Sequence, residues 1–116
     1  EWGWYRGAED LSVRAPGRPP EPSGPAISSD ILSTVGVLLM PATLVDRHGR
    51  RIGQGGGWYD RVLKQIGPTT KTAAMVYPEE FVDISLPQDP MDRPVHYVVL
   101  PDRWVPCEFM ENDAVA

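Results

Sequence analysis

The sequence has little cysteine and no long apolar run, and each shortage excludes a class of protein. A single cysteine, Cys107, cannot form an internal disulfide, so a secreted scaffold held by disulfides is excluded. Cys107, His48 and His96 lie too far apart along the chain to have the spacing of a structural zinc site. No apolar run approaches the roughly 18 residues of a membrane span, which excludes a transmembrane protein. The 116 residues suffice for one small domain at most.

Basic residues are also in short supply, and they are concentrated in one segment. The chain has 16 acidic and 11 basic residues, for a net charge of −5. Residues 47–71 contain six basic residues and one acidic residue, so this segment carries +5 and the remainder of the chain −10. Such a protein is a poor candidate for nucleic-acid binding. A short positive segment is better suited to a local anion such as a phosphate.

Composition divides the chain into three segments. Residues 1–34 are rich in proline and glycine, and they predict an extended segment, with a disordered leader as an equal alternative. Trp2, Trp4 and Tyr5 are candidates to pin that segment to the rest of the protein. Residues 35–103 contain the periodic apolar stretches of a folded domain. Residues 104–116 are acidic and without pattern, and they predict a flexible tail.

Three short apolar runs, at residues 35–40, 72–77 and 95–100, predict buried strands. The first run is continuous, which is typical of a strand that is buried on both faces. Helical spacing over residues 58–66 predicts a helix, and residues 78–82 predict one helical turn that starts at a proline. This alternation is typical of an open α/β sheet. One good helix cannot cover both faces of such a sheet, so the sequence indicates part of a domain.

A glycine-rich segment, GQGGG at residues 53–57, separates a predicted turn at residues 46–49 from the predicted helix. Glycines bring backbone N–H groups close to a ligand, and a helix start adds unpaired donors, so the segment predicts an anion cradle flanked by Arg51 and Arg61. The pattern matches neither a P-loop nor a complete G-x-G-x-x-G. A tight turn between strand and helix is an equally good interpretation of the glycines alone.

Two blocks of sequence, one of which includes the glycine-rich segment, resemble a known protein family. The stretch VLLMPATLVDRHGRRIGQGGGWYDRVL closely resembles the signature of the 5-formyltetrahydrofolate cyclo-ligase family, and AAMVYPEEFVDISLPQDPMDRPVHYVV resembles a later block of the same family. The resemblance covers about residues 35–100. It implies a three-layer α/β/α sandwich with a Rossmann-like open sheet, of which this chain has only the C-terminal part. Trp58 stands where the family more often has tyrosine or phenylalanine.

The resemblance implies an activity and a set of site residues. The activity is the ATP- and Mg²⁺-dependent cyclisation of 5-formyltetrahydrofolate to 5,10-methenyltetrahydrofolate, with release of ADP and phosphate. Arg51 and Tyr59 match catalytic positions, and Asp60 and Asp92 match two magnesium positions. The positions that match the ATP and folate site are Arg51, Gly53, Gln54, Gly55, Gly56, Gly57, Trp58 and Tyr59. The resemblance also implies a cytoplasmic enzyme, monomeric when complete, with no nucleic-acid or membrane partner.

Each of these residues also has an ordinary structural interpretation. Asp60 in the first turn of a helix interacts favourably with the helix dipole, and Asp92 can shape a turn. Trp58 and Tyr59 at helical spacing are more often core residues than ligand contacts. Arg51 can be a solvated charge at a strand end.

Two other functions compete with the ligase. A truncated, non-catalytic relative could bind nucleotide or a partner, and its exposed sheet edge would favour self-association. A sugar-phosphate isomerase of similar fold could share the glycine-rich segment, but it would need no second magnesium carboxylate at Asp92.

Overall fold

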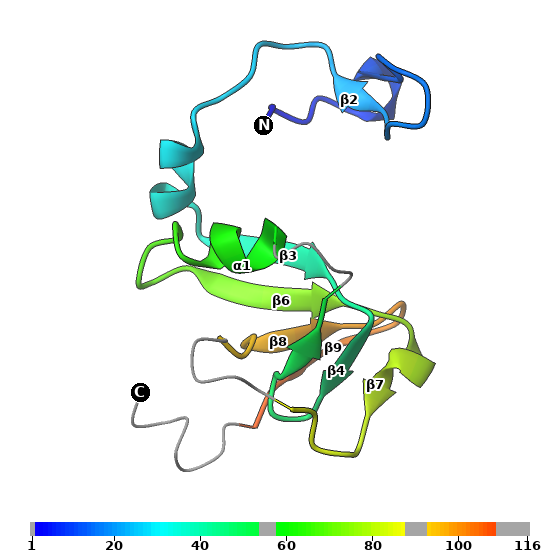
Figure 1. Cartoon of the computed structure of the whole chain (residues 1–116), viewed down its shortest axis with the longest axis vertical. Coiled ribbons are helices and arrows are strands. Elements are labelled where there is room, and N and C mark those ends of the chain that lie inside the picture. The colour runs from blue at the N-terminus through cyan, green and yellow to red at the C-terminus, as the bar shows by residue number, and fades with distance from the viewer. Residues whose placement is uncertain (1, 54–57, 88–92, 109–116) are drawn as a thin grey trace.

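The computed structural model describes residues 2–53, 58–87 and 93–108, and it has an N-terminal arm and a sheet region. The arm contains a small antiparallel hairpin, β1 (Leu11–Ser12) with β2 (Glu21–Pro22), and two 3-10 helices, η1 (Ala8–Asp10) and η2 (Ser29–Thr34). Figure 1 shows the hairpin standing apart from the sheet region, to which η2 leads. Trp2 pairs with Ile27 across the base of the arm.

The sheet region is built on four strands in the order β3-β6-β8-β9. Three of them are parallel: β3 (Val37–Pro41), β6 (Lys71–Met75) and β8 (Tyr97–Val99). The fourth, β9 (Trp104–Pro106), returns antiparallel to β8. Short runs of apolar residues favour these strands. Because β3, β6 and β8 are parallel, their carboxyl ends lie at the same end of the sheet.

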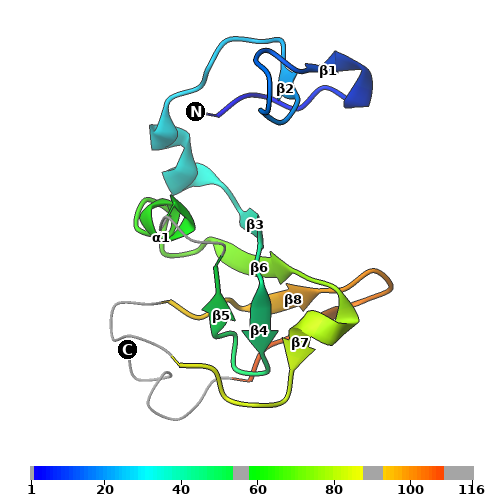
Figure 2. The ribbon, with the colours of Figure 1, turned by 45° about the vertical axis from the view of Figure 1, so that its right-hand side comes forward.

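A second sheet of three strands has the order β5-β4-β7. The strands β4 (Leu44–Asp46) and β5 (Arg51–Ile52) form an antiparallel hairpin, and β7 (Phe81–Val82) runs parallel to β4. Figure 2 shows this sheet beside the four-stranded sheet, below the helix α1 (Trp58–Leu63). A 3-10 helix, η3 (Pro78–Glu80), separates β6 from β7.

The core lies on one face of the four-stranded sheet. Leu38 and Met40 of β3 and Val98 of β8 point to this face, where they meet Val45 of β4 and Val62 of α1 in one buried cluster. Both connections between parallel strands therefore cover the same side of the sheet.

The opposite face is not covered by the described residues. Val37 and Leu39, which alternate with Leu38 and Met40, are 64% and 51% exposed. The prediction that the first apolar run is buried on both faces is therefore wrong for these two residues. The prediction followed from a run that is apolar at every position. No helix or strand among the described residues packs over Val37 and Leu39.

Most predicted elements of the sheet region are confirmed, with shifted ends. The three predicted strands are β3, β6 and β8, and the predicted helix is α1, which ends at Leu63 instead of residue 66. Within the predicted turn at residues 78–82, only η3 is helical, because Phe81 and Val82 pair with β4 as β7. The tail predicted from residue 104 begins with β9, a three-residue strand that is too short to have a detectable period.

The fold class is mixed α/β with few helices, as the sequence predicts. Of the three aromatic residues proposed to pin the arm, Trp2 packs against the core, whereas Trp4 and Tyr5 are exposed. None of the helices in the described part of the chain is long and apolar enough to span a membrane.

Candidate functional site

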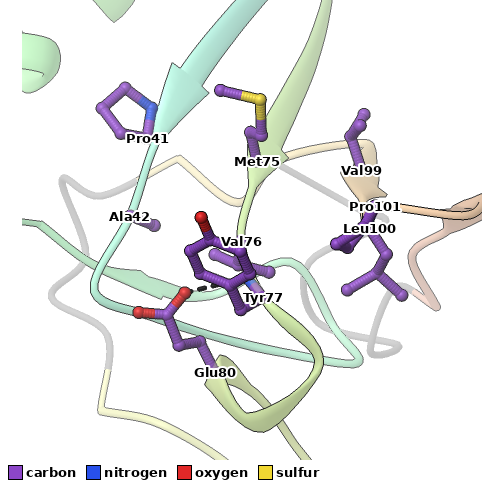
Figure 3. A pocket seen from close by; sticks show the side chains of 9 residues that line it. All are labelled: Pro41, Ala42, Met75, Val76, Tyr77, Glu80, Val99, Leu100 and Pro101. Atoms are coloured by element: carbon purple, nitrogen blue, oxygen red, sulfur yellow. Dashed lines mark hydrogen bonds between the residues drawn. The ribbon is translucent and has the colours of Figure 1, made fainter.

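The carboxyl ends of the parallel strands surround a cavity. In open α/β sheets, ligands bind in the crevice outside these ends. Here β3, β6 and β8 end beside a cavity of about 610 Å³, a volume within the usual range of ligand pockets. Its lining is mostly apolar (Figure 3) and consists of Pro41, Ala42, Met75, Val76, Tyr77, Glu80, Val99, Leu100 and Pro101.

One carboxylate is fixed in the lining of this cavity. The backbone N–H of Tyr77 donates to Glu80 Oε1 at 2.8 Å, a contact that closes the short turn of η3 (Figure 3). The Tyr77 side chain is exposed. The cavity thus combines an apolar surface with one oriented carboxylate. Sequence reasoning missed these residues; the available signal was that each lies within three residues of the end of a predicted strand.

Asp46 organises the hairpin that carries Arg51. Its buried carboxylate accepts hydrogen bonds from the backbone N–H groups of His48 and Arg50, at 2.9 and 3.0 Å, on Oδ1. The other oxygen, Oδ2, accepts from the backbone N–H of Leu86 at 2.9 Å. One side chain therefore joins the β4–β5 turn to the segment that leads from β7 toward residue 92.

Gly49 is the last residue of the turn predicted at residues 46–49. Its φ of +82° is left-handed, and a Cβ there would lie 2.1 Å from the carbonyl oxygen of Val95. The backbone N–H of Val95 also donates to the Gly49 carbonyl at 2.8 Å. Only glycine accommodates both the left-handed φ and this close approach to Val95. The turn therefore packs directly against the chain just before β8.

The structure brings two of the predicted site residues together. Nη2 of Arg51 lies 2.8 Å from Oδ1 of Asp60, which links β5 to the first turn of α1. The Arg51 side chain is only 7% exposed, whereas that of Asp60 is 57% exposed. Arg51 is therefore not the solvated strand-end charge that its sequence position allowed.

The Arg51 guanidinium is only partly satisfied. Its Nε is buried without a hydrogen-bond partner among the described residues. A Cβ on Gly53 would lie 3.1 Å from Arg51 Nη1, so the glycine lets the guanidinium lie close against the backbone. A buried donor without an acceptor costs about 1–3 kcal/mol.

The two aromatic residues at the start of α1 differ in how far they are exposed. Tyr59 is half-buried against the core, while Trp58 is 42% exposed. The two rings meet edge-on with centroids 4.7 Å apart, and Trp58 also lies 5.6 Å from Trp2. Trp58 thus presents a ring surface to solvent, and Tyr59 supports it from the core side.

The remaining predicted residues lie outside the described part of the chain. These are Gln54, Gly55, Gly56, Gly57 and Asp92. Arg93, next to Asp92 in sequence, donates from Nη1 to the Leu63 carbonyl at the end of α1, at 2.8 Å. Within the described residues, no group of three or more histidine, cysteine or acidic side chains has metal-binding geometry.

His96, which lies beside β6, is a partly buried titratable side chain. Its Nδ1 accepts from the backbone N–H of Thr72 at 3.0 Å. Burial, and to a lesser extent the charge of Lys71, lowers the pKa of His96 below its usual 6.5. The neutral ring is therefore favoured in the folded protein.

We expect the free energy of unfolding to decrease as the pH falls from about 6.5 toward the lowered pKa of His96. Over that range the unfolded chain binds a proton on this ring that the folded chain does not. Urea unfolding at several pH values, with His96→Asn alongside the wild type, measures the effect. The Asn variant keeps an acceptor near Nδ1, and its stability should change less with pH. Parallel pH curves for the two proteins would contradict the assignment.

Cys107 has no place in the candidate site. It packs partly buried against the core, and burial together with the charge of Asp46 raises the pKa of its thiol to about 12. It therefore stays protonated and unreactive at neutral pH.

The comparisons with known proteins agree on one family. The model of the 5-formyltetrahydrofolate cyclo-ligase family matches residues 1–101. A 5-formyltetrahydrofolate cyclo-ligase from Mycolicibacterium smegmatis is 33% identical over 105 residues, which are 90% of this chain and 53% of that protein. The Escherichia coli K12 protein of the same name is 37% identical over 73 residues, 62% of this chain and 40% of the relative.

A plant relative extends the same similarity. The mitochondrial 5-formyltetrahydrofolate cyclo-ligase of Arabidopsis thaliana is 32% identical over 81 residues, 62% of this chain and 29% of that protein. The chain thus spans about half the length of the mycobacterial relative, and less of the others.

Proposed function

The chain belongs to the 5-formyltetrahydrofolate cyclo-ligase family, and from this premise we propose that it supplies part of the ATP and folate site of such a ligase. The proposed reaction is the ATP- and Mg²⁺-dependent cyclisation of 5-formyltetrahydrofolate to 5,10-methenyltetrahydrofolate, with release of ADP and phosphate. Because the chain spans about half of the mycobacterial relative, the activity is proposed for the site completed by the remaining length of the family's domain.

The chemistry of the ring closure explains why ATP is needed. A formamide carbon is a poor electrophile, and its oxygen is a poor leaving group. In the proposed first step, the formyl oxygen attacks the γ-phosphorus of ATP and ADP leaves. N10 then attacks the activated carbon, and the C–O bond breaks to release phosphate as the ring closes. The protein must align these groups and stabilise the charge that develops on the phosphate oxygens.

The observation that carries the proposal is the Arg51 guanidinium. It is almost fully buried, held on one side by Asp60, and keeps an Nε donor without a partner among the described residues. A fixed guanidinium is suited to bidentate contact with phosphate, because little side-chain freedom is lost on binding. We propose that Arg51 contacts the transferred phosphoryl group. In the same proposal, Gly53 and residues 54–57 contact the nucleotide.

The two aromatic residues of α1 and the cavity complete the proposal for the ligands. We propose that the exposed ring of Trp58 packs against a ligand ring and that Tyr59 holds it in place, since aromatic side chains favour such stacking. The mostly apolar cavity at the strand ends, with the Glu80 carboxylate in its lining, is proposed to receive part of the folate.

The described residues are compatible with magnesium. Protein sites for this ion use one or two carboxylates together with phosphates and waters. Asp60 is more than half exposed, and only its Oδ1 is engaged by Arg51. Asp60 and Asp92 would hold the ion, which when bound would neutralise phosphate charge.

The architecture of the complete domain is part of the same proposal. Three parallel strands with one covered face are compatible with a three-layer α/β/α sandwich, of which residues 35–103 would be one part. Residues 1–34 would be an extended segment and residues 104–116 a tail. The complete enzyme is proposed to be a cytoplasmic monomer whose partners are small molecules.

A direct test follows the absorbance of the methenyl product. The chain, alone and joined to the segment that completes the mycobacterial relative, is mixed with 5-formyltetrahydrofolate and magnesium-ATP. We expect an ATP-dependent rise in the joined protein, and Asp92→Asn should weaken magnesium-ATP binding. An unchanged absorbance in both preparations would contradict the ligase proposal. It would favour the non-catalytic, partner-binding alternative, which the exposed sheet face supports.

A further inference from the structure

Arg51 and Asp60 are proposed to bind different groups, yet the structure joins their side chains directly. Nη2 of Arg51 lies 2.8 Å from Oδ1 of Asp60. An arginine and a carboxylate frequently pair through two parallel hydrogen bonds, whereas this pair has one. The contact therefore leaves Oδ2 of Asp60 and Nε of Arg51 unused.

Asp60 contacts the edge of the Arg51 guanidinium that suits a phosphate. Nε and Nη2 lie on one edge of the planar group and point the same way, an arrangement that binds two oxygens of one phosphate or carboxylate. Asp60 contacts Nη2, and Nε is buried without a partner among the described residues. Gly53 lies against Nη1 instead, where an added Cβ would be 3.1 Å away. A phosphate on the Nε–Nη2 edge would take the place of the Asp60 carboxylate.

The two partners differ in their freedom to move. The Arg51 side chain, on β5, is 7% exposed, whereas that of Asp60, in the first turn of α1, is 57% exposed. An ion pair with an exposed partner is weak, because water competes for the carboxylate. A phosphate group carries more negative charge and more acceptor oxygens than a carboxylate. It can therefore displace Asp60 while Arg51 stays in place.

The same contact opposes magnesium binding at Asp60. A guanidinium beside the carboxylate offsets its negative charge and repels a divalent cation. Protein sites for magnesium combine one or two carboxylates with the phosphates of a substrate. Asp60 is therefore a poor magnesium ligand while Arg51 holds it, and a better one after a phosphate has neutralised Arg51.

We infer that Asp60 exchanges partners when the site binds its ligands. It occupies the phosphate-binding edge of Arg51 beforehand, and it turns to magnesium when a nucleotide phosphate takes that edge. The exchange keeps the Arg51 guanidinium oriented and partly neutralised before binding, and it makes magnesium binding depend on the nucleotide. The inference rests on the proposed function and adds an order of events to the same site.

The test measures ATP binding to the joined protein by calorimetry, once with EDTA and once with magnesium. Asp60→Asn keeps the size of the side chain but removes the charge that holds it to Arg51. With EDTA, we expect Asp60→Asn to bind ATP about fivefold more tightly than the wild type, because a competitor for Arg51 is weakened. With magnesium, it should bind ATP severalfold more weakly, because a metal ligand is lost. One substitution thus changes the affinity in opposite directions.

Two further comparisons separate the exchange from a general effect of charge. Asp83→Asn removes an exposed carboxylate that is paired with Arg47, and it should leave ATP binding with EDTA unchanged. Asp60→Asn and Arg51→Gln, made singly and together, form a double-mutant cycle. In the Arg51→Gln background, Asp60→Asn should no longer tighten the binding of metal-free ATP, because the ion pair that it weakens is already absent.

Two results would overturn the inference and leave the proposed function standing. The first is that Asp60→Asn weakens magnesium-ATP binding without tightening the binding of metal-free ATP, which is the behaviour of a metal ligand that does not compete for Arg51. The second is equal tightening with and without Arg51→Gln, which is a long-range effect of charge. If the wild type binds no magnesium-ATP and forms no methenyl product, the proposed function fails, and the inference fails with it.

Discussion

Replacing Asp46 by alanine should lower the free energy of unfolding by about 3 kcal/mol, because one buried and two partly buried backbone N–H groups lose their acceptor, and a buried donor left without one costs about 1–3 kcal/mol. These groups belong to His48, Arg50 and Leu86. The total free energy of unfolding of a small domain is only about 5–15 kcal/mol. The variant should therefore be partly unfolded at mild temperature. Urea unfolding followed by circular dichroism measures the loss.

A neighbouring aspartate provides the matched control. Asp83 pairs with Arg47 at 2.6 Å, but both side chains are well exposed. Exposed ion pairs contribute roughly 0–1 kcal/mol, so Asp83→Ala should leave stability almost unchanged. The stability of Asp46→Asn should lie between those of Asp46→Ala and Asp83→Ala. The asparagine keeps one acceptor oxygen but places an amide N–H₂ where the second carboxylate oxygen accepts a hydrogen bond. Equal stabilities for Asp46→Ala and Asp83→Ala would show that the buried carboxylate does not hold the turn.

Arg51→Gln should weaken the binding of magnesium-ATP by about 10- to 150-fold. Charge-assisted hydrogen bonds contribute roughly 1.5–3 kcal/mol, and about 1.4 kcal/mol corresponds to tenfold in affinity. Arg51→Lys should recover little of the loss, because a lysine cannot reproduce the planar fork that Asp60 holds in place. The tryptophan fluorescence of the joined protein, to which the exposed Trp58 contributes, reports binding during a titration with magnesium-ATP.

Arg47→Gln is the control for this titration. Arg47 is a second arginine of the same hairpin, but its side chain is exposed and paired with Asp83. Its replacement should leave ATP affinity within twofold of the wild type. If Arg51→Gln and Arg47→Gln bind magnesium-ATP equally well, the proposed phosphate contact is wrong.

Local patterns predicted the secondary structure where they were long enough. The apolar runs that became β3, β6 and β8 contain enough residues to identify a strand, and the turn predicted at residues 46–49 is confirmed. The strands β5, β7 and β9 contain two or three residues each. A stretch that short has no measurable period, and its conformation is imposed by the strand beside it.

The candidate site was predictable in its residue types and not in its geometry. The family signature named Arg51 and Asp60, but it assigned them to phosphate and magnesium, and their direct contact was not foreseen. The cavity at the strand ends was missed because its residues come from three strands and the turns that follow them. Residues 54–57 and Asp92 stay predictions, since they lie outside the described residues.

The sequence by itself determined the family, the order of the main elements and the identity of the phosphate-contacting candidates, because each depends on residues close together in the chain. Only the tertiary structure decided that Asp46 joins two segments, that Arg51 is buried against Asp60, and that the described residues leave one apolar face of the sheet uncovered. These features depend on strand pairing and on the hand of the crossovers, which place side chains from distant segments together. A continuous apolar run predicts that both faces of a strand are buried, and only the folded chain shows whether other residues cover each face.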